Sequence, residues 1–193
     1  MEDKYAYEYL KQCLSEASQS DKPFAITMLT ADTHPTGGYV CDLCPEGYAD
    51  QYQTVYACAS RQLNDFIEWL KQQSFYENTT IVIAGDHCSM DNDYMTNTLG
   101  FYDNRYIYNC FINSAVEPVN SKNRVFTQLD MFPTTLAAMG VQIEGDRLAM
   151  GVNLFSDKQT LAEKYGFDAF NSMLSSKSTM YEYEFLYNKM VIE

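Results

Sequence analysis

The order of apolar and polar positions predicts two short buried strands separated by a long amphipathic helix. Residues 24–30 and 80–84 are mostly apolar runs of strand length. Between them, over residues 50–73, apolar side chains recur at every third or fourth position, as on one face of a helix. A strand, a helix and a second strand in this order predict a βαβ unit with a right-handed crossover. The two strands are therefore expected to be parallel and in one sheet.

Weaker patterns along the chain predict further elements. They are a helix over 5–17, a strand over 106–112, a short helix over 128–139 that bends near Pro133 and ends at Gly140, a helix over 161–174, and a strand in the alternating aromatic run 181–187. Together with the βαβ unit they predict an α/β fold, an α/β/α sandwich with a mostly parallel sheet. At 193 residues the chain is expected to form a single domain over 1–193.

The chain has two histidines, and each follows one of the two predicted strands. His34 comes after residues 24–30, and Asp86 and His87 come directly after residues 80–84 and a glycine. In open α/β sheets, ligands and catalytic groups sit just beyond the carboxyl ends of the strands. We therefore expect both histidines at one edge of the sheet, where a metal-dependent hydrolase or transferase places its active site.

Each of these residues also has a simpler interpretation. Asp86 and His87 form a mixed oxygen and nitrogen donor pair that suits Zn²⁺ or Mn²⁺ better than Ca²⁺, but Asp86 could equally cap a turn. His34 precedes Gly37 and Gly38, which let the backbone approach a ligand, so it could bind a phosphate oxygen or act as a general acid or base. Taken alone, each histidine fits an ordinary loop position better.

Composition excludes some classes of partner. The chain has 13 basic and 26 acidic residues, a net charge of −13, which argues against binding nucleic acid. No apolar run approaches the roughly 20 residues of a transmembrane helix. The start at Met1 lacks the apolar core of a signal peptide, so the chain taken by itself is expected to be soluble.

Six cysteines leave the redox state open. Cys41 and Cys44 form a Cys-x-x-Cys in a loop rich in glycine and proline, away from any helix start, which argues against a thioredoxin-like site. A structural zinc site would need two further ligands at matching spacing, and the sequence pattern indicates none. A local disulfide and a pair of free thiols are equally compatible with the sequence.

Other charged residues have no assigned chemistry at this point. Asp130 is expected to be a solvated carboxylate at a helix start, and Asp91 is expected to be a solvated loop residue. Arg105, Arg124 and Arg147 are candidate partners for an anion, although arginine is more often a surface residue.

Four segments together resemble the alkaline phosphatase superfamily, in its branch of sulfatase-like phosphoglycerol transferases and lipoteichoic acid synthases. The resemblance covers about residues 22–157. The segments are the run into Asp32-Thr33-His34 with Gly37-Gly38-Tyr39, the run Asn78 to His87, the run Gln128 to Leu136 with Gly140-Val141, and the run Gly151 to Ser156. Their order and spacing are similar to the C-terminal part of that catalytic domain, with 158–193 as a C-terminal extension of it.

The resemblance implies roles for the residues at the expected sheet edge. Asp86 and His87 would be two ligands of a divalent metal, Mn or Zn, and His34 would be a catalytic residue that contacts the substrate phosphate. Many relatives read Asp-His-x-Gly at this point, whereas this chain reads Asp-His-Cys-Ser-Met over 86–90. That variant resembles the periplasmic phosphoglycerol transferases of glucan modification more than the lipoteichoic acid synthases.

The family also has parts that this sequence lacks. Its threonine or serine nucleophile, a further acidic metal ligand and its membrane helices precede the segments seen here. The expectation is therefore the C-terminal part of a metal-dependent phosphoglycerol transferase. That enzyme would be membrane-anchored with this domain outside the cytoplasm, would take a phosphodiester or phospholipid head group, and would use a glycan or glycerol acceptor. The alternatives are a sulfatase or phosphodiesterase that hydrolyses, and a non-catalytic binding domain.

Overall fold

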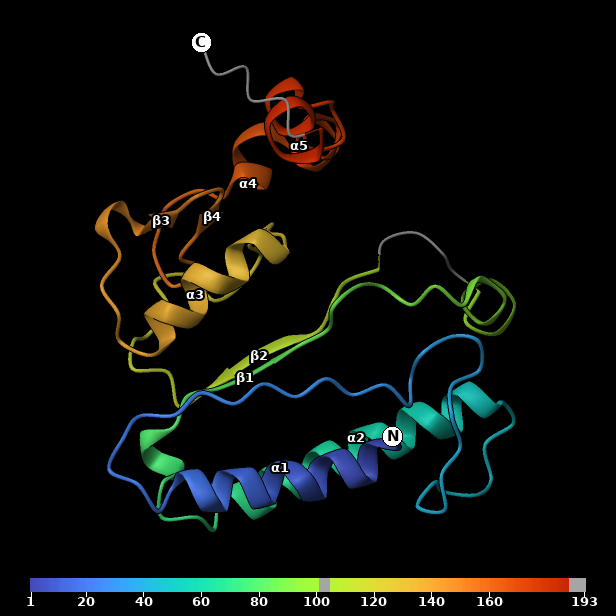
Figure 1. Cartoon of the computed structure of the whole chain (residues 1–193). Coiled ribbons are helices and arrows are strands. Elements are labelled where there is room, and N and C mark those ends of the chain that lie inside the picture. Colours follow the sequence, from blue (N-terminus) through green and yellow to red (C-terminus); the bar gives the residue numbers. More distant parts are fainter. Residues whose placement is uncertain (101–104, 188–193) are drawn as a thin grey trace. The chain divides into compact units, whose positions relative to one another are not determined.

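The computed structural model describes residues 1–100 and 105–187 (Figure 1). The chain divides into two compact units, one of residues 1–79 and 83–110 and the other of residues 80–82 and 111–193. A single domain over 1–193, with 158–193 as its extension, stays a prediction, and residues 188–193 lie outside the described residues.

Helices and short strands alternate along the chain. The α-helices are α1 (Asp3–Ala17), α2 (Gln51–Leu70), α3 (Met131–Ala138), α4 (Leu161–Tyr165) and α5 (Phe167–Leu174). The strands are β1 (Ile81–Ala84), β2 (Asn109–Ile112), β3 (Arg147–Leu148) and β4 (Gly151–Val152). Shorter helical turns are η1 (Tyr76–Asn78), η2 (Tyr94–Thr98), η3 (Gln128–Asp130), η4 (Glu144–Asp146) and η5 (Tyr181–Leu186).

In the first unit, α1 and α2 lie side by side and run in the same direction (Figure 1). The rings of Tyr7 and Phe66 are 5.3 Å apart, and one turn further along both helices the Lys11 ammonium lies 6.0 Å from the Trp69 ring. Asp50 begins α2 by accepting a hydrogen bond from the backbone N–H of Tyr52, as a helix N-cap does. The predicted helices over 5–17 and 50–73 are confirmed.

The segments that follow these two helices run back along them. Residues 24–30 begin beyond the end of α1, and Asp32 returns to Asp3 in the first turn of that helix. β1 begins beyond the end of α2, and Ser89 returns to Tyr52 in its first turn. Residues 24–30 and β1 therefore point the same way, as the βαβ prediction requires.

The expected pairing of these two segments is wrong for the described residues. β1 pairs with β2, and the Gly85 N–H extends this pairing by donating to the Tyr108 carbonyl over 2.9 Å. Residues 24–30 are extended but belong to no strand, and Leu29 among them is 76% exposed. An apolar run sets a local extended conformation, whereas a strand also needs a neighbouring backbone to satisfy its N–H and C=O groups. The described residues thus contain two two-stranded sheets and no parallel sandwich.

In the second unit, α3 packs on the β3–β4 hairpin, which is antiparallel with Leu148 opposite Gly151. Asp130 joins these elements. Its carboxylate accepts from the Val152 N–H at 2.8 Å and from the Thr127 N–H at 2.9 Å, and its side chain is buried. The expectation that Asp130 is solvated is therefore wrong, and burial raises the pKa of this carboxyl although the two N–H donors oppose that shift.

Two predictions for the C-terminal part need correction. The predicted helix 161–174 is divided into α4 and α5 at Gly166, where φ is +82°. The aromatic run 181–187 is not a strand, because residues 181–186 form the helical turn η5. The Tyr181 and Phe185 rings, four residues apart, stack at 5.7 Å, so contacts at helical spacing replace the alternation of a strand.

Gly151 is at a position where the fold leaves no room for a side chain. A Cβ atom there would lie 2.0 Å from the Leu129 carbonyl oxygen, a backbone atom that cannot move away alone. We expect Gly151→Ala to lower the free energy of unfolding by about 3 kcal/mol, the upper range of overpacking. Gly85→Ala is the matched control, since its Cβ would lie 2.8 Å from a side-chain methyl of Ile107, Cγ2, and at an ordinary 3.9 Å from the Tyr108 backbone. Equal midpoints of urea denaturation for the two variants would contradict the close approach of Gly151 to the Leu129 carbonyl.

None of the described helices is both long enough and apolar enough to cross a bilayer.

Candidate functional site

Hydrogen bonds join the two segments that contain the histidines, within the first unit. The Tyr52 hydroxyl donates to the Thr33 carbonyl at 2.7 Å and lies 3.4 Å from Ser89 Oγ. Tyr52 is 2% exposed, and burial raises the pKa of its phenol to about 12, so the hydroxyl keeps its proton at neutral pH. Thr33, which precedes His34, and Ser89, two positions after His87, thus both contact the side chain of Tyr52.

Asp91 makes a second connection between these segments. One of its carboxylate oxygens accepts from the Gly37 N–H at 3.0 Å, and the other accepts from the Tyr94 N–H at 3.0 Å. Asp91 is 7% exposed, so the expectation of a solvated loop carboxylate is wrong. Sequence reasoning missed Asp91 and Tyr52 because their partners are distant backbone groups, which no local pattern reveals.

Asp86 and His87 stand exposed at the end of β1. The His87 Nε2 atom lies 3.3 Å from Asp86 Oδ2, and Nδ1 lies 2.8 Å from the Cys88 carbonyl oxygen. A carbonyl only accepts, so Nδ1 holds a hydrogen, and Nε2 presents a lone pair to the carboxylate when the ring is neutral or donates to it when the ring is charged. With the neutral ring, one metal ion between Nε2 and Oδ2 would satisfy both atoms. Two ligands on a tetrahedral ion at about 2.0 Å are roughly 3.3 Å apart, so the donor pair fits zinc-like geometry.

His34 has the same tautomer. Its Nδ1 atom lies 2.8 Å from the Pro35 carbonyl oxygen, which leaves Nε2 on this exposed ring as an acceptor, or as a donor when the ring is charged. The loop behind it is tight, because the Tyr39 N–H donates to the Asp32 carbonyl at 2.7 Å. A Cβ atom on Gly38, where φ is +66°, would lie 2.7 Å from that same carbonyl oxygen.

The loop is anchored to α1 by a pair of buried carboxyl groups. Asp3 accepts hydrogen bonds from the Ala31 N–H at 2.7 Å and the Asp32 N–H at 3.1 Å, while Asp32 accepts from the Asp3 N–H at 3.2 Å. Burial raises the pKa of the Asp32 carboxyl, and the nearby Asp3 carboxylate adds to the shift. Asp3 and Asp32 thus fix the position of the chain at the point where residues 24–30 end and the loop that contains His34 begins.

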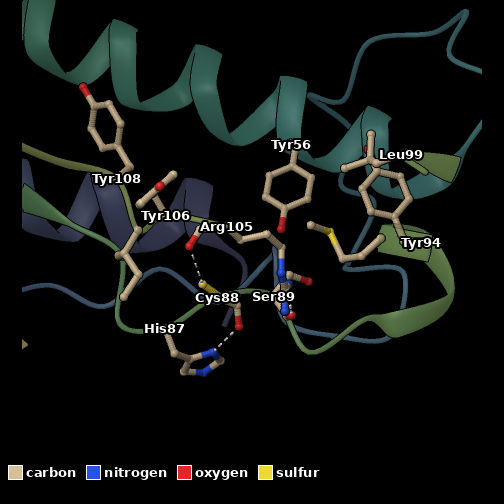
Figure 2. A pocket seen from close by; sticks show the side chains of 12 residues that line it. Tyr56, His87, Cys88, Ser89, Tyr94, Leu99, Arg105, Tyr106 and Tyr108 are labelled. Atoms are coloured by element: carbon tan, nitrogen blue, oxygen red, sulfur yellow. Dashed lines mark hydrogen bonds between the residues drawn. The ribbon is translucent and has the colours of Figure 1, made fainter. Parts of the chain in front are cut away.

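A pocket of about 600 Å³ lies beside His87 (Figure 2). Arg105 lines it together with His87 and four tyrosines, Tyr56, Tyr94, Tyr106 and Tyr108. An Arg105 guanidinium nitrogen donates to the Ser89 carbonyl at 2.6 Å, which holds this cation close to the His87 segment. Of the three arginines considered from the sequence, Arg105 is thus placed to meet an anion near His87, whereas Arg124 forms an ion pair with Glu163 in the second unit.

Comparison with known proteins identifies the family. The Sulfatase family model matches residues 1–141. The chain belongs to the Sulfatase family. The family match confirms the resemblance found in the sequence and implies an alkaline-phosphatase-like α/β fold. Sulfatase-family proteins typically depend on divalent metals.

Curated relatives are named phosphoglycerol transferases. Phosphoglycerol transferase I of Citrobacter koseri is 30% identical over 83 residues, which are 40% of this chain and 11% of that protein. The proteins of the same name from Escherichia fergusonii and Escherichia coli are 30% and 29% identical over the same length, with the same coverage. The match thus spans a small part of these relatives. No solved structure matches the chain.

Proposed function

We propose that this Sulfatase-family chain provides the metal-binding and phosphate-binding edge of a phosphoglycerol transferase that acts on a phosphodiester such as a phospholipid head group. The main support is the pair of hydrogen-bonded links through Tyr52 and Asp91, which hold the His34 loop beside the segment that follows Asp86 and His87. The names of the relatives support transfer of phosphoglycerol as the reaction.

In this proposal Asp86 and His87 hold a divalent metal, Mn or Zn, through Oδ2 and Nε2. The 3.3 Å separation of these two atoms supports this, because it matches the separation of two ligands on one tetrahedral ion. A metal ion bound there would lower the pKa of a hydroxyl nucleophile and offset the charge of the phosphate.

His34 and Arg105 act on the phosphate in this proposal. His34 donates a hydrogen bond from Nε2 to a phosphate oxygen when its ring is charged, or accepts a proton there when it is neutral. Arg105 faces the same pocket as His87 and supplies a permanent positive charge there, in a chain whose net charge is −13.

The remaining parts of the active site are proposed to lie outside residues 1–193. A threonine or serine there would attack the phosphodiester and an acceptor hydroxyl of a glycan or glycerol would then take the phosphoglycerol group. Membrane helices there would anchor the protein, with this domain outside the cytoplasm. The match to only 11% of the Citrobacter koseri relative supports this, as does the exposure of Leu29 in a segment expected to be sheet core. A mostly parallel α/β/α sandwich, with residues 24–30 as a strand, belongs to the same proposal.

Hydrolysis by a sulfatase or phosphodiesterase is the second candidate function, since the family name and the metal-ligand geometry fit it equally well. The two reactions differ in the acceptor, water or a sugar or glycerol hydroxyl.

The metal site has a direct test by calorimetry. We expect Asp86 and His87 to bind Mn²⁺ or Zn²⁺ weakly in the 193-residue chain, because two protein ligands fall short of the three found in catalytic zinc sites. Asp86→Ala combined with His87→Ala should remove this weak phase, and His34→Ala should leave it unchanged. Asp157→Ala, an exposed carboxylate in the second unit, is the control. A weak phase that survives the double substitution would contradict the assignment.

The 193-residue chain alone is expected to show no turnover of a chromogenic phosphodiester with Mn²⁺ or Zn²⁺. The reason is chemical, because the proposed edge binds and polarises the phosphate but offers no hydroxyl assigned to attack it. Saturable activity that His87→Ala abolishes would show instead that these residues form a complete enzyme.

A further inference from the structure

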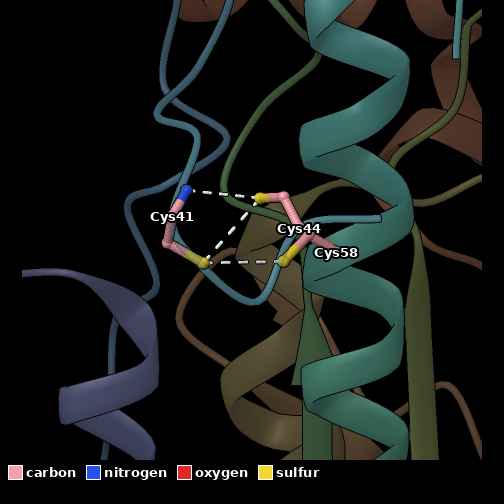
Figure 3. A group of neighbouring side chains, drawn as sticks. All are labelled: Cys41, Cys44 and Cys58. Atoms are coloured by element: carbon pink, nitrogen blue, oxygen red, sulfur yellow. Dashed lines mark hydrogen bonds between the residues drawn. The ribbon is translucent and has the colours of Figure 1, made fainter. Parts of the chain in front are cut away.

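Three cysteine side chains meet at one point of the first unit, apart from the residues of the proposed phosphate site. Cys41 and Cys44 come from the loop before α2, and Cys58 comes from the second turn of that helix (Figure 3). The Cys41 sulfur lies 3.8 Å from that of Cys44 and 3.7 Å from that of Cys58. All three sulfurs lie within 4.8 Å of one another, with Cys41 and Cys58 buried and Cys44 half-buried.

These distances correspond to a metal site. Sulfurs bound to one zinc ion at about 2.3 Å in tetrahedral geometry are separated by roughly 3.8 Å, whereas the sulfurs of a disulfide are about 2.05 Å apart. The sequence pattern indicated no zinc site at Cys41 and Cys44, because Cys58 follows as a single cysteine and not as a second pair of ligands.

Hydrogen-bond donors surround the sulfurs as they do in thiolate sites. The Cys41 N–H donates to Cys44 Sγ at 3.3 Å, and the Gln62 side-chain amide donates to Cys58 Sγ at 3.4 Å. Gln62 lies one turn after Cys58 and is 8% exposed. A buried amide group directed at a sulfur is a typical outer-shell partner, since it stabilises the negative charge of a metal-bound thiolate.

We propose that Cys41, Cys44 and Cys58 bind one zinc ion as thiolates, a structural site distinct from the pair Asp86 and His87. On binding, each thiol releases its proton to solvent and no electron is transferred, because zinc has no redox chemistry in proteins. The fourth position takes water, since Glu2 and Asp42 lie within 4.8 Å of the Cys41 sulfur but not of all three sulfurs. Lys4 forms ion pairs with both of these carboxylates.

The site would fix the path of the chain between the His34 loop and α2. The loop that begins at Asp32 passes through Gly38 and Cys41 before α2 begins at Gln51, and Gln51 donates to the Gly38 carbonyl at 3.2 Å. A zinc ion that joins residues 41 and 44 to α2 would therefore restrain the loop next to His34. This inference does not depend on the proposed transferase function.

Metal analysis of the purified 193-residue chain tests the proposal. The protein is produced with added zinc, purified under reducing conditions without chelators, and analysed for zinc by elemental mass spectrometry. We expect one zinc ion per chain in the wild type, and none in Cys58→Ser or Cys44→Ser. The matched controls are Cys13→Ser, a half-buried cysteine on α1, and the Asp86→Ala, His87→Ala double variant, and both should keep the zinc ion.

A second measurement covers the case in which Cys58→Ser fails to fold. Replacing zinc by Co²⁺ in the wild type should give intense thiolate-to-cobalt absorption, which should be absent in Cys44→Ser, whose altered side chain is in the loop and half-buried. Three outcomes overturn the proposal: a wild type without metal and with all thiols reactive, peptide mapping that finds a disulfide from Cys41 to Cys44 or Cys58, or zinc retained in both serine variants.

Discussion

Alanine at Asp86 or His87, introduced into a longer protein that contains this chain and has the proposed transferase activity, is expected to lower the rate of phosphoglycerol transfer more than 100-fold. The proposal makes both side chains direct metal ligands, and loss of the residues that only orient such ligands already costs about 10- to 100-fold. The expected loss is in kcat as well as kcat/KM, because a bound metal stabilises charge that develops in the transition state.

Two variants make this result specific. His34→Ala should also lower activity but leave metal content unchanged, since His34 is proposed to contact the phosphate. Asp157→Ala removes an exposed carboxylate of the second unit and should leave activity within about twofold. Near wild-type transfer by His87→Ala with normal metal content would exclude Asp86 and His87 as the metal site.

Arg124→Ala should be among the most destabilising substitutions in the second unit, with a loss of about 3 kcal/mol in the free energy of unfolding. Arg124 and Glu163 form a bidentate ion pair, at 2.7 Å and 3.1 Å, and their side chains are only 10% and 17% exposed. Arg124 also donates to three carbonyls, of Leu154, Ser156 and Lys158. Removing one partner of such a pair leaves the other charge without compensation in a poorly solvated place.

An exposed ion pair provides the comparison. Lys71 and Glu68 pair at 2.7 Å on α2, but their side chains are 47% and 55% exposed. Lys71→Ala should therefore change stability by less than about 1 kcal/mol. Urea denaturation of both variants measures the contrast, and equal losses would contradict the structural role of Arg124.

The ion pair between Arg124 and Glu163 also makes the stability of the second unit depend on pH. The hydrogen bond from Arg124 lowers the pKa of the Glu163 carboxyl below its usual 4.5, with further help from the Thr160 and Val125 N–H groups. A carboxyl whose pKa is lower in the folded state stabilises the fold above the unfolded pKa, and this contribution is lost as pH falls through the folded value. Glu163→Gln should thus lose stability at pH 7 and show a weaker decline below pH 4.5 than the wild type.

The pattern of apolar residues within a single segment was sufficient to predict some of the helices and strands. The helices over 5–17 and 50–73 and the strand at 80–84 are present, because each has its periodicity or its β-branched run within one segment. The same reasoning was wrong for 181–187, and residues 24–30 form no strand with any of the described residues. A strand exists only with a partner, and the alternating aromatic residues also satisfy the four-residue spacing by which Tyr181 stacks on Phe185.

For the candidate site, the sequence indicated the histidines and missed what holds them. The position of His34 and His87 after apolar runs pointed to one edge of the fold, and the hydrogen bonds of Tyr52 and Asp91 place their two segments together. These links, like the approach of Cys58 to Cys41, join residues far apart in the chain. Such contacts depend on how α2 packs and have no signature in local spacing.

Asp86 and His87 are proposed to bind the metal of this Sulfatase-family site. Anomalous diffraction from crystals of the chain tests this most directly, with Mn²⁺ soaked in above the dissociation constant that calorimetry gives. We expect a manganese peak within bonding distance of Asp86 Oδ2 and His87 Nε2, with any zinc peak confined to Cys41, Cys44 and Cys58. A manganese peak only elsewhere, with Asp86 and His87 unaltered and empty, would contradict it.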